Sequence, residues 1–443
     1  LRATLLPAAF RGLGIWLPSS IARAAWALLL LAGLLFVRRA RFSGDAITRV
    51  ANTLSAMLLL VVAGRLVLAL LNDPHLGADE TSLVAAAAEG GSVDAALAQA
   101  PPAPETSPDI YYLVFDRYAG ERTLRREFDH DNAGFLQQLR QRGFVIADDS
   151  RANYPQTIVS MAAALNLNYH APPIAAHADY AAAIAEHRLG RWLKQQGYVY
   201  GHFGNWHQPL RSNPQADFHS VAGWLPSEFA EALCTLTPAA EFLPLPGAPQ
   251  PIRNQFSAIE QFAAQTPGRK FVYAHFLLPH PPFVFDADGT TLPDHVACRR
   301  DFKTNYRNQL QFTNRRLLKL IDHLQQTANR PPIIILHADE GPYLSPSYRQ
   351  LPQARQLAKR FDILTACSLP GQPAAAAAVP SDLSPVNTFR LVLREYFEVP
   401  LELLPNRAFY WENVTPEGSL DWRRPGTFKD VSHQLTRQSS SGL

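Results

Sequence analysis

The sequence predicts an α/β fold, in which a mainly parallel sheet is covered by helices on both faces and is preceded by transmembrane helices. Two short apolar runs, 110–115 and 332–337, indicate strands that are buried on both faces, as the central strands of parallel sheets are. From residue 109 onward such runs alternate with helical patterns, which is typical of a sheet packed between helices. Two longer apolar stretches come before them.

Residues 1–75 are expected to form a transmembrane helical hairpin, truncated at its N-terminus because the chain begins with leucine. The stretches 15–37 and 51–71 each supply the roughly 20 residues that a membrane-spanning helix needs. Each also carries one arginine, which is costly in hydrocarbon, and a pair of amphipathic core helices is the alternative. The connection between them holds four arginines against one aspartate, so we expect it in the cytoplasm and the following chain outside.

Three further segments follow the hairpin. Residues 76–108 are rich in alanine and proline and predict a linker. Residues 109–405 are expected to form the catalytic domain, and 406–443 a C-terminal extension with a disordered end.

The elements of the catalytic domain follow from local patterns. The stretch 301–327 carries an apolar stripe at helical spacing, and Ser384-Pro385 is a typical helix start. Residues 204–250 show no strand pattern and are expected to pass over the site as a long excursion. The predicted strands are 110–115, 143–147, 197–203, 270–277, 332–337 and 361–366. The predicted helices are 131–142, 156–166, 178–196, 251–265, 301–327 and 386–397.

Composition excludes several classes of function. The chain has 443 residues, 47% of them hydrophobic, and can therefore bury a large core. Its net charge is only +3 and it has no long basic block, which argues against nucleic acid as a partner. The three cysteines lack zinc-ligand spacing. Cys367 is expected to be buried and inert, while pairing of Cys234 with Cys298 depends on the redox compartment and stays open.

Acidic residues follow two predicted strands. Asp116 follows the predicted strand 110–115, and Asp339 and Glu340 follow the predicted strand 332–337. Because ligand sites of open α/β sheets lie at the carboxyl ends of strands, we expect these three carboxylates to meet around a metal ion. Without a cation they would repel one another. For Asp116 alone, a helix cap or a turn is the alternative.

Thr157 is the candidate nucleophile. It lies just after Pro155, where a helix should begin, and the free N–H groups of a helix start favour an oxyanion. A hydroxyl coordinated to a metal there becomes a competent nucleophile. An ordinary N-cap threonine is the alternative, and Ser160 is the second candidate.

His280 is the candidate proton donor or anion-binding residue. It lies between prolines in a loop that follows the predicted strand 270–277. His275, within that strand, is a weaker candidate for function.

Four blocks in order along the chain resemble those of the sulfatase/alkaline phosphatase superfamily. The plan is similar to that of its membrane-anchored, sulfatase-like branch, which includes lipoteichoic acid synthases and lipid A phosphoethanolamine transferases. The resemblance spans roughly residues 109–405 and implies an alkaline-phosphatase-like fold. It implies that Asp116 and Asp339 are metal ligands, that Thr157 is a metal-bound nucleophile forming a covalent intermediate, and that His280 contacts the substrate. The blocks are Asp109–Asp116, Asn153–Thr157, His275–Phe283 and Ile333–Gly341.

The chain departs from the family pattern in three ways. Asp116-Arg117 stands where the family usually has Asp-Gly, and Arg117 argues for one metal ion at most. Glu340 stands in place of a ligand histidine. The formylglycine motif Cys/Ser-x-Pro-x-Arg is absent from the sequence. A ligand set made only of oxygens suits Mn²⁺, Mg²⁺ or Ca²⁺ better than Zn²⁺. The predicted metal ligands are Asp116, Thr157, Asp339 and Glu340. The candidate substrate-binding residues are Arg117, Asn153 and His275.

The function expected from these features is that of a membrane-anchored, metal-dependent hydrolase or transferase. It would act on sulfate or phosphate esters of anionic cell-envelope lipids or glycans, from the periplasmic side of a bacterial inner membrane, with the lipid bilayer as a partner. The alternative is a catalytically silent protein of the same plan that binds an envelope lipid or glycan. A soluble cytoplasmic α/β enzyme would require the first 71 residues to lie outside a membrane.

Overall fold

The computed structural model describes residues 92–170, 175–205, 207–221, 249–343, 353–411 and 426–435, with a few isolated positions before residue 54. Those six ranges belong to one compact unit, Ser82–Glu228 with Pro244–Leu443. The predicted transmembrane stretches lie almost wholly outside the described residues, as do Cys234 and the predicted disordered end. Among the residues described, no helix is long and apolar enough to cross a bilayer.

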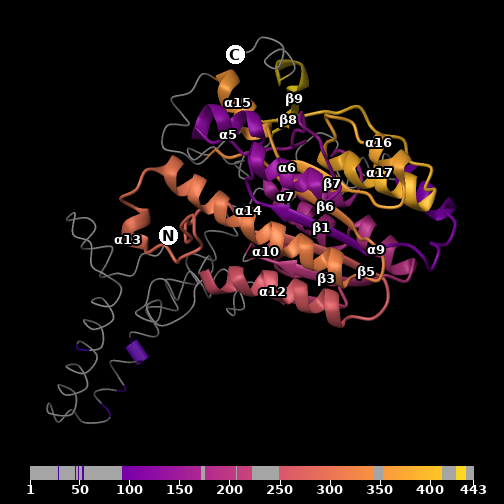
Figure 1. Ribbon diagram of the computed structural model, residues 1–443, viewed down its shortest axis with the longest axis horizontal. Coiled ribbons are helices and arrows are strands. Elements are labelled where there is room, and N and C mark those ends of the chain that lie inside the picture. Colours follow the sequence, from indigo (N-terminus) through magenta and orange to yellow (C-terminus); the bar gives the residue numbers. More distant parts are fainter. Residues whose placement is uncertain are drawn as a thin grey trace. The chain divides into compact units, whose positions relative to one another are not determined.

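A seven-stranded sheet forms the centre of this unit (Figure 1). The strand order is β2-β7-β6-β1-β5-β3-β4. The run from β6 to β4 is parallel, whereas β7 is antiparallel to both of its neighbours. The sheet is therefore mainly parallel, as predicted. The strands are β1 (Ile110–Phe115), β2 (Phe144–Ile146), β3 (Val199–Gly204), β4 (Phe218–Val221), β5 (Lys270–Phe276), β6 (Ile333–Ala338) and β7 (Thr365–Ser368).

Helices cover both faces of the sheet (Figure 1). The residues of β1 alternate between the two faces, since Tyr111, Leu113 and Phe115 join one apolar cluster and Ile110, Tyr112 and Val114 join the other. The first cluster holds residues of α5 (Glu121–Phe128), α6 (Ala133–Gln141), α12 (Pro249–Gln265), α14 (Phe302–Thr327) and α15 (Gln353–Phe361). The second holds residues of α7 (Thr157–Leu165), α8 (His177–Ala185), α9 (Arg188–Gln195), α16 (Pro373–Ala377) and α17 (Pro385–Phe397). Two further helices are short, α10 (Gln208–Arg211) and α13 (Asp294–Ala297).

Three local predictions were wrong. The stretch predicted to lack strands contains β4, which is only four residues long and has no clear alternation. The single helix predicted at 178–196 is two helices, because His187 caps α9 by accepting the Gly190 N–H at 2.9 Å. The strand predicted at 361–366 begins only at Thr365, since α15 continues to Phe361.

The ends of the catalytic region extend the core. Residues 92–99, inside the predicted linker, are helical and bury Val93 and Leu97. At the other end, β8 (Phe409–Tyr410) pairs with β9 (Lys429–Asp430), and Trp411 is fully buried. The Phe409 N–H donates to the Asn153 carbonyl oxygen at 2.8 Å, which ties the predicted extension to the segment before α7.

Candidate active site

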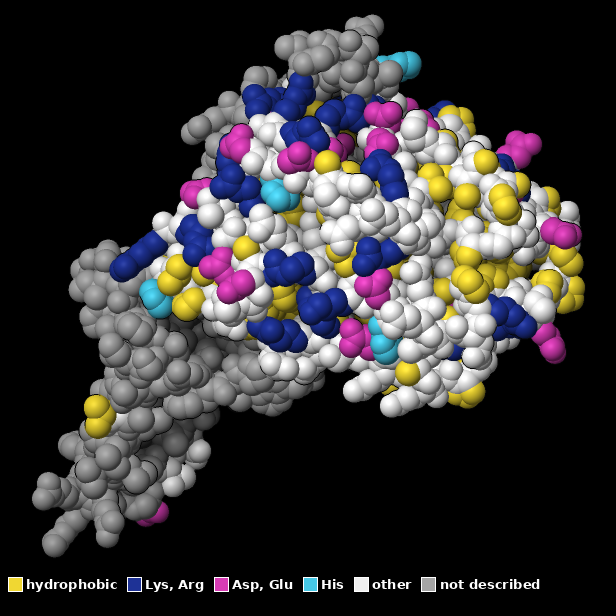
Figure 2. Space-filling model, viewed as in Figure 1, with side chains coloured by type: hydrophobic (Ala, Val, Ile, Leu, Met, Phe, Trp, Pro, Cys, Tyr) yellow, Lys and Arg dark blue, Asp and Glu magenta, His cyan; other side chains and the backbone are white. Residues whose placement is uncertain are grey.

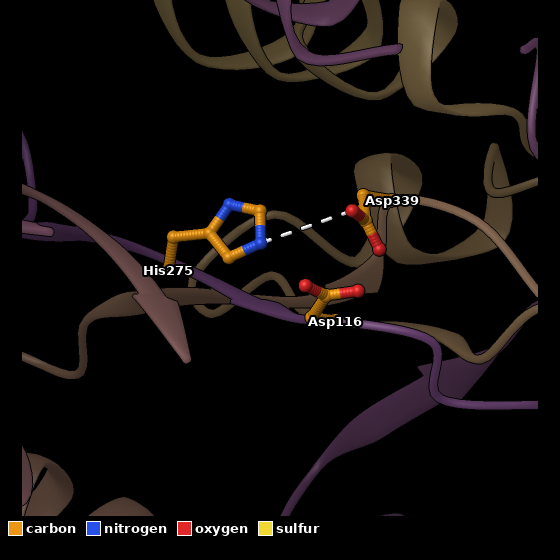
Figure 3. Close-up of side chains that lie close together, drawn as sticks. All are labelled: Asp116, His275 and Asp339. Atoms are coloured by element: carbon orange, nitrogen blue, oxygen red, sulfur yellow. Dashed lines mark ion pairs between the residues drawn. The ribbon is translucent and has the colours of Figure 1, made fainter. Parts of the chain in front are cut away.

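Three neighbouring strands deliver the central group of the site. Asp116 follows β1 and Asp339 follows β6, while His275 is the last residue but one of β5. The order β6-β1-β5 and the parallel register bring these positions together. Figure 3 shows the three side chains pointing toward one another, and one ligand atom from each lies within 4.8 Å of the others. The predicted meeting of Asp116 and Asp339 is therefore seen, with a histidine as the third member.

The group is buried and its polar atoms are incompletely paired. Asp339 and His275 are fully buried and Asp116 is 6% exposed. Among the described residues, Asp116 Oδ1, His275 Nε2 and Asp339 Oδ2 have no hydrogen-bond partner. His275 Nε2 lies 3.8 Å from Asp339 Oδ2 (Figure 3). Because unpaired buried polar atoms are costly, and all three are ligand atoms, the group fits a cation.

The electrostatics support the same conclusion. Burial, and then the Asp339 charge, raises the pKa of Asp116 well above its usual range, although Arg117 opposes the shift. Burial lowers the pKa of His275 to about 4, with Asp339 opposing. Near pH 7 the imidazole is therefore neutral and keeps a lone pair. A divalent cation would favour the ionised carboxylates and remove their repulsion.

Tyr273 determines which nitrogen of His275 faces the carboxylates. Its hydroxyl oxygen lies 3.1 Å from His275 Nδ1. In the tautomer in which Nδ1–H donates to this hydroxyl, Nε2 presents its lone pair to Asp116 and Asp339. A hydrogen bond on the distal nitrogen is the usual way to orient a metal-binding imidazole.

Arg117 lies against the group in a strained backbone conformation. Its φ of 60° is in the left-handed region that residues other than glycine rarely adopt. The backbone N–H donates to Asp339 Oδ1 at 3.2 Å, and Nε donates to Glu340 Oε1 at 3.1 Å. Nη2 donates to the Tyr343 hydroxyl at 2.9 Å. Nη1 is buried and has no hydrogen-bond partner among the described residues, so it can donate to a ligand.

Glu340, a predicted metal ligand, is engaged by arginines. Besides the bond from Arg117, its Oε2 lies 3.7 Å from Nη2 of Arg360, on α15. Burial raises the pKa of Glu340 to about 7, and both arginines oppose the shift. Its side chain is not one of the three that could hold an ion together in the described part of the chain.

A helix begins at Thr157, as the sequence predicts. Thr157 is the first residue of α7 and is half-buried, and the N-cap is Gln156, so Thr157 does not have the alternative role of a cap. The first turn of α7 lies beside Asp339, because the Ser160 hydroxyl donates to the Asp339 carbonyl oxygen at 2.8 Å. That bond gives Ser160 a structural role.

Asn153 and His280, two further predicted site residues, make hydrogen bonds or close contacts with backbone groups. Asn153 is buried and its amide bonds to backbone, accepting from Val386 N–H at 3.0 Å and donating to the Arg407 carbonyl oxygen at 2.8 Å. His280 is half-buried, and its Nδ1 faces the Pro281 carbonyl oxygen. Burial, then the Arg117 charge, lowers the pKa of His280 well below its usual value, so the ring is neutral near pH 7.

Three features of the site were not predicted from the sequence: His275 as a metal ligand, the contact of Tyr273 with His275, and the contact of Arg360 with Glu340. A signal for the first two was present, since Tyr273 and His275 alternate along one strand and end near its carboxyl edge. No local signal pointed to Arg360, which reaches the site from α15.

Known proteins share this architecture. The sulfatase family model matches residues 127–368, slightly more than half of the chain. No curated protein sequence matches significantly. The C-terminal periplasmic domain of EptC from Escherichia coli, in complex with Zn, is similar with a TM-score of 0.50 and 12% identity, covering 75% of this chain and 97% of that one.

Two further structures are similar at lower scores. The C-terminal periplasmic domain of phosphoethanolamine transferase EptC from Campylobacter jejuni has a TM-score of 0.44 and 13% identity, covering 65% of this chain and 88% of that one. Phosphonate monoester hydrolase of Agrobacterium radiobacter has a TM-score of 0.44 and 13% identity, covering 74% and 90%. At these identities the structural likeness concerns the fold alone.

Proposed function

The chain belongs to the sulfatase family, and from that premise we propose that it is a metal-dependent hydrolase or transferase of sulfate or phosphate esters. The observation that carries the proposal is the buried group of Asp116, His275 and Asp339, whose unpaired ligand atoms converge at the carboxyl edge of the sheet. The substrates proposed are esters of anionic cell-envelope lipids or glycans.

Asp116, His275 and Asp339 would hold one divalent cation, which supplies positive charge to stabilise the charge that develops on the transferred group. The preference for Mn²⁺, Mg²⁺ or Ca²⁺ over Zn²⁺ was based on a set of oxygens that included Glu340. With an imidazole in the set, Zn²⁺ and Mn²⁺ are both suitable. One ion, not two, is proposed, because the Arg117 guanidinium lies 3.9 Å from Asp116 Oδ1 and adds its own positive charge there.

The Thr157 hydroxyl oxygen attacks the phosphorus or sulfur, the bond to the leaving oxygen breaks, and the hydroxyl proton passes to that leaving oxygen. The N–H groups at the start of α7 and Arg117 Nη1 donate to the oxygens of the ester. Water or an acceptor hydroxyl then attacks the phosphorus or sulfur of the covalent Thr157 ester, the bond to the Thr157 oxygen breaks, and that oxygen takes up a proton again. Because Nδ1 of His280 faces a carbonyl oxygen, Nε2 can accept the proton of that attacking hydroxyl.

The location proposed is the periplasmic side of a bacterial inner membrane, with residues 1–75 as the membrane anchor. Two observations support it. Hydropathy and the arginine-rich connection in 1–75 favour a hairpin with the following chain outside the cytoplasm. The EptC structure that shares the fold is itself a periplasmic domain.

A screen of artificial esters tests the proposal. The purified chain, stripped with EDTA, is given phosphate monoesters, phosphate diesters and sulfate esters, with Mn²⁺, Zn²⁺, Mg²⁺ or Ca²⁺ added back one at a time. We expect at least one ester to turn over only with metal present, and calorimetry to give one ion bound per chain.

The silent alternative has its own supporting observation, the pairing of Glu340 with Arg117 and Arg360 where a ligand histidine is usual. Absence of binding by all four metals would contradict the proposal and favour that alternative. Turnover that is unaffected by EDTA would remove the metal from the mechanism.

Replacing Tyr273 by phenylalanine should weaken metal binding about tenfold. The change removes only the hydroxyl that contacts His275 Nδ1, so the imidazole loses its fixed orientation. Calorimetric titration with Mn²⁺ or Zn²⁺ measures the effect. The matched control is Tyr200→Phe, because the Tyr200 hydroxyl contacts His187 and His202 on the same side of the sheet and not His275. Equal weakening by both changes would mean that Tyr273 acts only through packing.

A further inference from the structure

The buried face of α14 carries two polar side chains, Tyr306 and Gln309, one turn apart. The outer face of this helix meets solvent: Arg315 and Lys319 are exposed, and Figure 2 shows Lys and Arg side chains over the place where Figure 1 draws α14. Tyr306 is 1% exposed and Gln309 is fully buried. Because a buried polar group is costly unless it is hydrogen-bonded, the partners of these two side chains indicate what they do.

Tyr306 holds the loop that follows β1. Its hydroxyl donates to the Arg117 carbonyl oxygen at 2.7 Å and accepts the Ala119 N–H at 3.1 Å. Arg117 has a φ of 60°, and a strained backbone of this kind persists only where the surrounding contacts hold it. Tyr306 therefore fixes the backbone from which the Arg117 guanidinium reaches Glu340 and Asp116.

Gln309 holds the loop that carries His280. Its Nε2 donates to the His280 carbonyl oxygen at 2.9 Å and lies 3.4 Å from the carbonyl oxygens of Pro279 and Pro282. Its Oε1 accepts the Val284 N–H at 2.8 Å. One buried amide thus engages the backbone before, at and after His280.

We propose that Tyr306 and Gln309 are positioning residues, through which α14 holds the two loops that bring Arg117 and His280 to the reaction. The inference rests on the proposed function, in which Arg117 donates to the oxygens of the ester and His280 accepts the proton of the attacking hydroxyl. A helix of 26 residues packed on the apolar core is a rigid support, and catalytic groups work only within a narrow range of positions.

Replacing Tyr306 by phenylalanine should weaken the binding of inorganic phosphate or sulfate about tenfold and lower kcat/KM by a similar factor. The ring keeps its stacking on Phe128, with centroids 4.1 Å apart, and only the hydroxyl is lost. Calorimetry on the full chain in detergent, with one equivalent of Mn²⁺, measures the affinity. Added to Arg117→Met, the change should have no further effect, because Tyr306 acts through Arg117.

Replacing Gln309 by methionine should instead lower kcat about tenfold or more and leave anion affinity and kcat/KM close to those of the parent chain. His280 is proposed to act after the covalent ester has formed, so its displacement slows only that second step. Added to His280→Ala, the change should have no further effect. Gln309→Glu gives a second reading if the methionine variant folds poorly, because it keeps an acceptor for the Val284 N–H and loses the donor to the His280 carbonyl oxygen.

Two matched controls remove similar groups elsewhere. Tyr118→Phe removes a buried hydroxyl that donates to Asn314 at 2.6 Å and accepts from Asn132 at 3.0 Å, next to Arg117 in sequence. Gln325→Met removes an amide of α14 that donates to the Arg142 carbonyl oxygen at 3.0 Å. Both controls should leave anion affinity and kcat near those of the parent chain.

Hydrogen exchange of the metal-free chain gives a reading that is independent of turnover. Tyr306→Phe should speed exchange in the peptide that contains Ala119, and Gln309→Met in the peptide that contains Val284, because each change removes the acceptor of that amide. Faster exchange of both peptides in both variants would mean general loosening and would overturn the inference.

The inference also fails if the controls change binding or kcat as much as the test variants do, if either double variant shows additive losses, or if the parent chain binds neither anion. The proposed function can fail separately. If no ester turns over, but anions bind and Tyr306→Phe weakens that binding, the chain is a binding protein in which α14 still positions the Arg117 loop.

Discussion

Replacing Thr157 by alanine should lower kcat by about 10⁴-fold or more on any ester that the chain turns over. The hydroxyl is the only group proposed to form the covalent intermediate, and its loss removes the nucleophile from the start of α7. Stability should change little, because Thr157 is not the N-cap residue of that helix and alanine is a good helix former. Turnover is measured in the ester assay with the preferred metal, and folding by thermal unfolding.

Ser160→Ala is the matched control for this prediction. Its hydroxyl donates to the Asp339 carbonyl oxygen, so the change should cost about 1 kcal/mol of stability and reduce kcat far less than the Thr157 change does. Full activity in the Thr157 variant would exclude Thr157 as nucleophile. If the Ser160 variant alone were inactive, the second candidate from the sequence would become the nucleophile.

Replacing Asp116 by asparagine should weaken metal binding at least about a hundredfold and, in the metal-free chain, raise the free energy of unfolding by about 1 kcal/mol. The gain arises because the Asp116 carboxylate is buried beside Asp339, which raises its pKa and makes its charged form unfavourable in the folded state. For an acid whose folded pKa is raised, stability falls as the pH rises above the unfolded value of about 4. The advantage of asparagine should therefore grow from about pH 4 upward.

Urea unfolding of the EDTA-treated chain at several pH values measures this effect, and calorimetry measures metal affinity. The control is Asp286→Asn, which should act in the opposite direction. Asp286 accepts two hydrogen bonds from Arg300, at 3.2 and 3.1 Å, and the first cause of its lowered pKa is that arginine. If the metal-free Asp116 variant were less stable than the parent chain, burial beside Asp339 would not be destabilising the charged Asp116 carboxylate.

The main features of the fold could be predicted because they depend on local patterns. The uninterrupted apolar runs of β1 and β6 indicate strands covered on both faces, and the helices on the two faces of the sheet bury both sides of β1. The helix start at Thr157 follows from the proline two residues before it. Local patterns could not predict the antiparallel direction of β7 or the presence of the short β4, because both depend on pairing with strands elsewhere in the chain.

By itself the sequence determined the strands that end in Asp116 and Asp339, the helix that begins at Thr157 and the order of the family blocks, since periodicity and capping act over a few residues. Only the tertiary structure decided that His275 completes the group and that Arg117 and Arg360 engage Glu340. Strand order and register brought His275 beside the two aspartates, and α15 packing against Gly341 brought in Arg360. Contacts of this kind join residues 20 to more than 200 positions apart, and no local pattern encodes them.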